Sequence, residues 1–235
     1  MFENIILIFV IINMPIIIFF NPITKFINIF DVADNVRKFH KNNVPLFGGI
    51  LIIYNLIFFF VLDYFLNLNL SQEIINKREY FTFCIGTIIF FCIGIFDDKY
   101  NLSANKKLFL NFFILLFLTL TDDNLVVKQL NFSFFENKIY LNNFSYLFTI
   151  LCVLLFLNAI NMFDGINLQT ATYCIIIFSI FLFKGIYISL STIFICVLIL
   201  FLFYNSLNKI FLGDSGTQVL AFVISYVLIK SYNLN

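Results

Sequence analysis

Two adjacent aspartates, Asp97 and Asp98, end a long apolar run in the stretch CIGIFDDKYNLSANKKL, residues 92–108. Neighbouring carboxylates repel each other, and a charge at membrane depth costs about 2.5–3.5 kcal/mol on insertion scales. Such a pair indicates either a bound cation or a catalytic task. The simpler alternative is a helix that stops at a membrane surface, with Lys99 neutralising one of the two charges.

Three further stretches place polar residues in apolar surroundings. Asn158, Asn161 and Asp164 lie in LNAINMFDGINL, Asp214 lies in KIFLGDSGTQ, and residues 37–50 read RKFHKNNVPLFGGI. Each stretch also has a plainer interpretation. The two asparagines share a helix face and can bind a neighbouring helix, the DG pair can form a turn, and Asp214 can cap a helix.

The donor types in these stretches favour a hard cation. The chain has five cysteines but no CxxC spacing, and only one histidine, so a zinc site is not expected. Carboxylate oxygens suit Mg²⁺, with Mn²⁺ as an alternative, and Mg²⁺ readily bridges phosphates. Basic residues in 37–41 can hold further phosphate oxygens. The residues alone therefore predict metal-dependent phosphoryl chemistry and leave the substrates open.

The composition indicates that membrane helices position these polar residues. Of the 235 residues, 62% are hydrophobic and 11% are charged, against about 25% charged in soluble domains. The formal charge of +1 gives no basic surface for nucleic acid, so no nucleic-acid partner is expected. We predict one all-α membrane domain over residues 1–235, a polytopic bundle of about eight transmembrane helices. The charge-free runs are 4–24, 42–62, 80–96, 108–121, 139–163, 165–183, 185–208 and 215–229.

Alternating spans sort the loops into two sets. One set (25–47, 97–107, 162–168 and 205–215) carries eight Lys and Arg residues, and the other carries six. The positive-inside rule places the first set in the cytoplasm, and all the unusual polar stretches fall in it. We therefore expect one site on the cytoplasmic face. In the other set, aromatic and polar residues partly alternate within 122–143, which predicts a short hairpin.

The four stretches, in this order, resemble the polyprenyl-phosphate N-acetylhexosamine-1-phosphate transferases (the MraY/WecA superfamily). The matching motifs are RKFHKNNVPLFGGI (37–50), GIFDDKYNLSANKKL (94–108), NAINMFDGIN (158–167) and KIFLGDSGT (209–217). VPLFGG and NMFDG are more similar to the branch that uses UDP-N-acetylhexosamines. The resemblance implies Mg²⁺-dependent transfer of a sugar-1-phosphate from a UDP-sugar to a polyprenyl (undecaprenyl) phosphate, with release of UMP. It also implies a multi-pass protein of the inner (plasma) membrane bilayer, and leaves a homodimer open.

The resemblance assigns roles residue by residue. Asp97, Asp98 and Asp164 match catalytic positions, and Asp214 together with Asp98 matches metal-ligand positions. The substrate-binding positions that it implies are Lys41, Asn158, Asn161, Asn167 and Phe211, with Phe211 at the position that stacks on uracil and Lys41 at one near the base.

Two departures from the family pattern stand out. Asn167 replaces a second acid of the family's DGIDGL motif, and an amide offers donors as well as an acceptor. The family also continues with further helices and a His-x-His loop, whereas this sequence ends at Asn235 and its histidine is His40. The alternatives are a fragment, a site completed by another chain, or an inactive remnant. A transporter is a further alternative, which predicts acids near helix centres and on both faces.

Overall fold

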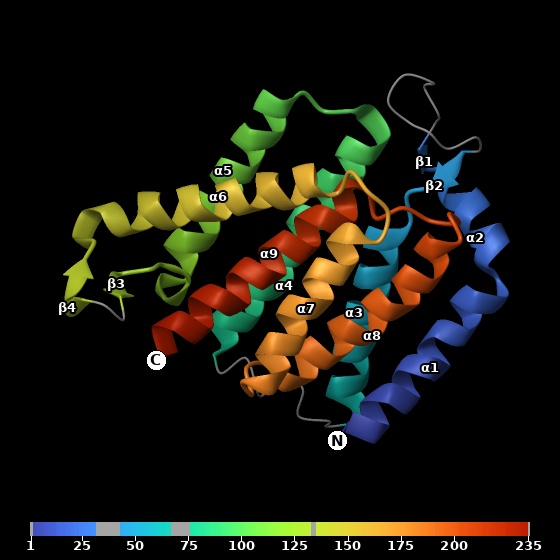
Figure 1. Ribbon diagram of the computed structural model, residues 1–235, viewed down its shortest axis with the longest axis horizontal. Coiled ribbons are helices and arrows are strands. Elements are labelled where there is room, and N and C mark those ends of the chain that lie inside the picture. Colours follow the sequence, from blue (N-terminus) through green and yellow to red (C-terminus); the bar gives the residue numbers. More distant parts are fainter. Residues whose placement is uncertain (1, 32–42, 67–75, 133–134, 235) are drawn as a thin grey trace.

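The computed structural model describes residues 2–31, 43–66, 76–132 and 135–234. These residues form an almost entirely helical bundle (Figure 1). The helices in the described ranges are α1 (Phe2–Ile18), α2 (Phe20–Ile27), α3 (Gly48–Leu66), α4 (Lys77–Tyr100), α5 (Ala104–Thr121), α6 (Ser145–Phe163), α7 (Gln169–Phe183), α8 (Ile188–Ser206) and α9 (Gly213–Leu234). The short strands are β1 (Phe30–Asp31), β2 (Val44–Pro45), β3 (Gln129–Phe132) and β4 (Phe135–Tyr140), and the 3-10 turns are η2 (Asp123–Leu125) and η3 (Asn142–Phe144).

Helix α9 runs through the middle of the bundle (Figure 1), and every residue from Ser215 to Val227 is buried. It packs most extensively against α4 and also contacts α6, α3 and α7. This part of α9 is apolar on nearly all sides, which is typical of a helix surrounded by others. The position of its N-terminal end therefore depends on the helices around it.

Glycines on α3 and α4 allow those helices to approach α9 closely. A Cβ atom on Gly49 would lie 2.6 Å from the backbone nitrogen of Gly216. A Cβ atom on Gly94 would lie 2.3 Å from the Cα atom of Ser215. Small residues at helix contacts permit such approach in membrane proteins. The packing brings the C-terminal end of α4, which carries Asp98, against the N-terminal end of α9.

The number of membrane spans differs from the expected eight. In the described part of the chain, α4, α5, α8 and the segment Asn142–Phe163 are long and apolar enough to cross a membrane. The pair α1–α2 adds a fifth candidate if it counts as one bent span. Gly48–Leu62 and α7 are apolar but shorter, and the 15 residues of α7 rise only about 22 Å against a hydrocarbon core of about 30 Å. The architecture is compatible with a membrane helical bundle, and eight spans are not confirmed.

The predicted span 4–24 is interrupted. Its two parts, within α1 and α2, meet at an angle of 72°. Pro22 lacks the N–H group that would bond to the carbonyl of Ile18, and its ring would clash with that carbonyl. The apolar run therefore continues through a bend that composition alone does not show.

The hairpin expected within 122–143 is confirmed. Strands β3 and β4 pair antiparallel, with Gln129 opposite Tyr140 and Leu130 opposite Ile139. A second short pair, β1–β2, places Phe30 opposite Pro45. Just after β2, Leu46 forms a parallel bridge with Phe211, which connects this pair to the segment before α9.

A buried cluster of charged residues lies at the N-terminal end of α4, whereas Asp98 lies at its C-terminal end. Lys230 of α9 is 2% exposed; its Nζ lies 2.6 Å from Oδ2 of Asp122 and 3.4 Å from Oε1 of Glu79. Thr82 donates a hydrogen bond to the same Asp122 oxygen. Lys230 is one of the six basic residues counted in the other loop set, and that count was wrong for it, because α9 continues beyond the apolar run and buries it among partners.

Candidate active site

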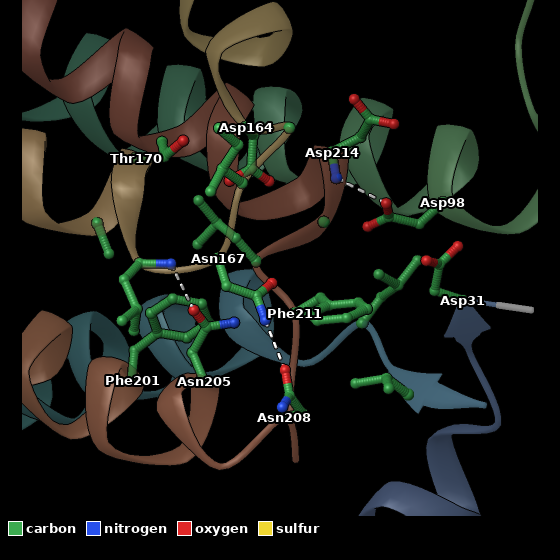
Figure 2. Close-up of a pocket in the computed structure, with 18 of the residues that line it drawn as sticks. Asp31, Asp98, Asp164, Asn167, Thr170, Phe201, Asn205, Asn208, Phe211 and Asp214 are labelled. Atoms are coloured by element: carbon green, nitrogen blue, oxygen red, sulfur yellow. Dashed lines mark hydrogen bonds between the residues drawn. The ribbon is translucent and has the colours of Figure 1, made fainter. Parts of the chain in front are cut away.

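An open cavity of about 1010 Å³ lies at the end of the bundle where α4 ends and α9 begins (Figure 2). Residues from all four loops of the predicted inside set line it, including Asp31, Asp98, Asn101, Asn161, Asp164, Asn167, Asn205, Asn208, Phe211 and Asp214. The separate stretches therefore lie around one cavity, as expected.

Asp98 holds the start of α9. Its Oδ1 accepts a hydrogen bond from the backbone N–H of Asp214 (2.7 Å, Figure 2), and its Oδ2 accepts one from Ser215 (3.1 Å). A carboxylate at a helix N-terminus satisfies unpaired N–H groups and opposes the helix dipole. Gly213 has φ of +74°, and a Cβ atom there would lie 2.8 Å from Asp98 Oδ2. Only glycine allows this approach without strain.

Asp97 faces away from the cavity, into an ion pair. Its Oδ2 lies 2.6 Å from Lys107 Nζ, and its Oδ1 accepts the N–H of Leu102 at 2.8 Å. Lys107 also lies 2.5 Å from Oδ1 of Asp214, so one ammonium group joins two carboxylates. The repulsion between the adjacent aspartates is thus relieved by divergent side chains and separate partners.

Lys107 itself was not among the predicted site residues. From the sequence it stands in the loop 97–107, just before the charge-free run 108–121. Instead α5 begins at Ala104, and Lys107 is 8% exposed. The only sequence signal was its place in the matched stretch 94–108, which did not distinguish it from Lys106.

Asn161 joins the same group from α6. Its Nδ2 donates hydrogen bonds to Asp214 Oδ1 and, at 3.2 Å, to Thr217 Oγ1. Asn158, one turn earlier on α6, is half-buried and does not line the cavity. The two asparagines that share a helix face therefore have different surroundings.

Asp164 follows the last residue of α6 and faces the cavity near Asp214 (Figure 2). Burial raises the pKa of its carboxyl group to about 7, and the neighbouring carboxylates of Asp214 and Asp98 act in the same direction. Close acidic groups in a partly dry cavity are typical of functional sites, because the structure gains nothing from their repulsion.

Two loops form the opposite wall of the cavity. Asn167 Nδ2 donates a hydrogen bond to Asn208 Oδ1 at 2.6 Å, across the exposed rim. The ring of Phe211 lies between Asn167 and Asp31 in Figure 2. The backbone of Phe211 is held by hydrogen bonds with Pro45, Phe47 and Gly48. An aromatic ring beside two amides offers a stacking surface next to hydrogen-bonding edges, which suits a flat polar ligand.

Six of the predicted residues meet at the cavity: Asp98, Asn161, Asp164, Asn167, Phe211 and Asp214. Asp97 and Asn158 lie beside it, and Lys41 falls outside the described residues. Sequence reasoning did not single out Asp31, Asn101, Lys107, Asn205 or Asn208. In a chain so rich in asparagine, Asn205 and Asn208 have no distinguishing feature, although both lie just before a matched motif.

The carboxylates fit a cation that is shared with a substrate. Among the described residues, no three His, Cys, Asp or Glu side chains gather closely enough to enclose a metal. Mg²⁺ is commonly held by one or two carboxylates together with substrate phosphates. Asp98, Asp164 and Asp214 line one cavity, and Asp214 Oδ2 has no hydrogen bond in the described structure. This donor set suits such a site better than a complete protein cage.

Comparison with known proteins defines the family. The model of Glycosyl transferase family 4 matches residues 80–232, which include most of α4 and α9 and every cavity-lining residue from Asp98 to Asp214. The chain belongs to this family. The matched range contains three of the four motifs on which the resemblance was based.

Curated relatives carry related names. The chain is 25% identical over 208 residues to the undecaprenyl-phosphate alpha-N-acetylglucosaminyl 1-phosphate transferase of Yersinia pestis, covering 84% of this chain and 54% of that protein. It is 26% identical over 209 residues to the protein of that name in Escherichia coli strain K12, with the same coverage. A probable undecaprenyl-phosphate N-acetylglucosaminyl 1-phosphate transferase of Bacillus subtilis is 28% identical over 196 residues, 80% of this chain and 52% of that one. The chain spans about half the length of these relatives.

Proposed function

We propose that this protein transfers a sugar-1-phosphate, an N-acetylhexosamine phosphate, from a UDP-sugar to a polyprenyl phosphate and releases UMP. The product would be the first lipid-linked intermediate of a cell-envelope glycan. The proposal rests on family membership and on the names of the relatives. The observation that carries it furthest is the convergence of Asp98, Asn161, Asp164 and Asp214 on one cavity.

The charges of the cavity suit a reaction between phosphates. A phosphate monoester is mostly ionised at neutral pH because its second pKa is about 6. Its attack on a diphosphate therefore needs positioning and charge neutralisation more than proton removal. Lys107 offsets part of the negative charge of Asp97 and Asp214 from behind the cavity lining, and Asp98 holds the helix that carries Asp214. A bound Mg²⁺, held by Asp214 and Asp98 with Asp164 nearby, would neutralise phosphate charge.

The second wall suits the nucleotide. We assign the ring of Phe211 to stacking on the base, and the amides of Asn167 and Asn208 to its polar edge. Asn208 was not expected, but its hydrogen bond to Asn167 places two amide groups side by side. Together they offer both donors and acceptors, which a single acid at position 167 would not.

We place the site on the cytoplasmic face of the inner (plasma) membrane. The four loops that form the cavity are those with the larger number of Lys and Arg residues. Lys107 and Lys230 are both buried inside helices, and they belong to opposite loop sets. Leaving both lysines out lowers each set by one, so the first set still carries two more Lys and Arg residues than the second.

A transfer assay on detergent-solubilised protein tests the function. It combines radiolabelled UDP-N-acetylglucosamine, undecaprenyl phosphate and Mg²⁺, and counts lipid-extractable label. We expect Asp164→Asn to lower transfer at least 100-fold. Asp123→Asn is the matched control, because Asp123 is exposed on η2, at the far end of the bundle. Bound UDP-sugar without transfer would indicate an inactive remnant, and no binding would remove the proposal. The mass of the active species reports whether it is a homodimer.

A further inference from the structure

We propose that Asn205 is a positioning residue that sets the spacing between the two loops of the nucleotide wall. The loops are 164–168, which carries Asp164 and Asn167, and 207–212, which carries Phe211. The inference rests on the proposed function in assigning these loops to the nucleotide. The link between the loops is visible in the structure itself.

Asn205 lies in the last turn of α8 and is 3% exposed. Its Oδ1 accepts a hydrogen bond from the backbone N–H of Leu168 at 2.8 Å, which Figure 2 shows as a dashed line. Its Nδ2 donates to the carbonyl of Ile210, also at 2.8 Å. One buried amide thus holds a backbone group from each loop, and it uses its acceptor for one and its donor for the other.

The first loop needs such a support. Leu168 has φ of +70°, a left-handed conformation that is unfavourable for a residue with a Cβ atom. It is the N-cap residue of α7, and its side chain makes no capping hydrogen bond. The bond from its N–H to Asn205 therefore fixes the point where the loop turns into the helix. If that bond is lost, Leu168 can relax and carry Asn167 with it.

The second loop supplies the rigidity. Ile210 is fully buried, and the next residue, Phe211, bonds through its backbone to Pro45, Phe47 and Gly48. Asn205 transmits this fixed position to Leu168 and its neighbour Asn167, whereas Asp164, at the other end of the first loop, bonds through its own N–H to the carbonyl of Asn161 on α6. The Asn167–Asn208 hydrogen bond also joins the loops, but it is exposed to solvent. An exposed amide pair readily exchanges its hydrogen bond for bonds to water. The two buried hydrogen bonds of Asn205 therefore contribute more to holding the loops together.

Two measurements on Asn205→Ala test the proposal. The first is hydrogen exchange of the peptide that covers 164–170, where we expect exchange at least 10-fold faster than in the wild type. The second is the KM for UDP-N-acetylglucosamine, which we expect to rise at least 10-fold while kcat changes less than 3-fold. Asn205→Asp keeps the acceptor for Leu168 but loses the donor to Ile210, so we expect an intermediate exchange rate.

Asn55→Ala is the matched control. Asn55 is a fully buried asparagine that pairs with Asn13 between α3 and α1, and it does not line the cavity. We expect this variant to lose thermal stability without a change in KM or in exchange over 164–170. Equal effects of the two alanine variants, or unchanged exchange in Asn205→Ala, would overturn the proposal. An inactive wild type would count against the proposed function alone, because the exchange measurement still decides whether Asn205 holds the loops.

Discussion

At the scale of single residues, neighbours in sequence have separate tasks. Asp97 is buried in an ion pair with Lys107, whereas Asp98 faces the cavity and caps α9. The sequence predicted that both acids matter, because an unpaired charge in an apolar run is costly. It could not predict which acid faces which partner. That depends on the rotation of α4 relative to α5 and α9, and a one-residue change in that rotation would place Asp97 where Asp98 lies.

Lys107→Met should lower both stability and transfer. Removing one partner of a buried ion pair costs about 3–5 kcal/mol, because the other charges stay buried. Asp214 is partly open to the cavity, so we expect a loss of about 2–3 kcal/mol in the free energy of unfolding and at least a 100-fold loss of transfer. Thermal melting in detergent and the transfer assay measure the two effects. Lys106→Met, at an exposed neighbour, should change neither, and an equal loss there would contradict the assigned role.

The raised pKa of Asp164 predicts an unusual pH dependence. The pKa of this group in the unfolded chain is near 3.9, and in the folded protein it is about 7. The folded state therefore binds the proton more tightly, and the contribution of this group to stability is lost as pH rises from about 4 to 7. With EDTA present, the melting temperature of the wild type should fall by a few degrees relative to Asp164→Asn between pH 5 and pH 8. Parallel melting curves for the two proteins would refute the assignment.

At the scale of elements, helices were easier to predict than their ends and bends. Long apolar runs located most of the helices, and partial alternation located the hairpin β3–β4. The bend between α1 and α2 was missed, because Pro22 acts through backbone geometry and not through polarity. The burial of Lys107 and Lys230 was missed because a lysine beside an apolar run has the same pattern whether it reaches water or a carboxylate. Only the packing of α4, α5 and α9 distinguishes these cases.

Gly213→Ala tests the contact between α4 and the start of α9. A left-handed φ disfavours alanine by about 1–2 kcal/mol, and the added Cβ would also press on Asp98 Oδ2. We expect unfolding to become easier by about 1–3 kcal/mol and transfer to fall at least 10-fold. Gly165→Ala is the stability control, because its Cβ would meet nothing within 4 Å. A change beyond about 0.5 kcal/mol in that control would show that glycines in this region matter for another reason.

At the scale of the whole molecule, the same three helices are joined by charges at both ends. At the cavity, Lys107 of α5 bridges Asp97 of α4 and Asp214 of α9. At the far end, Lys230 of α9 contacts Glu79 of α4 and Asp122, the residue after α5. Nothing in the linear sequence pairs these residues, since they lie up to about 150 positions apart. The family resemblance predicted the cavity, and it gave no indication of the far cluster.

The two ends should lie on opposite sides of the membrane. In a background without the native cysteines, Lys128→Cys and Lys209→Cys place single thiols at exposed positions near the far end and near the cavity. A membrane-impermeant maleimide should label Lys128→Cys in intact cells, and Lys209→Cys only after the membrane is opened. Labelling in the reverse order would invert the assigned orientation.

The central place of α9 has a consequence for biosynthesis. This helix is translated after α3, α4 and α6, which pack against it in the structure. Until it leaves the ribosome, Lys107 has Asp97 but lacks Asp214, and Glu79 and Asp122 lack Lys230. We therefore expect the earlier helices to form a loosely packed intermediate in the membrane until α9 is inserted, with these charged residues still lacking their partners on α9. Arrival of α9 brings Asp214 and Lys230 to their partners at both ends and supplies part of the cavity lining, so the cavity should appear only once α9 has been inserted.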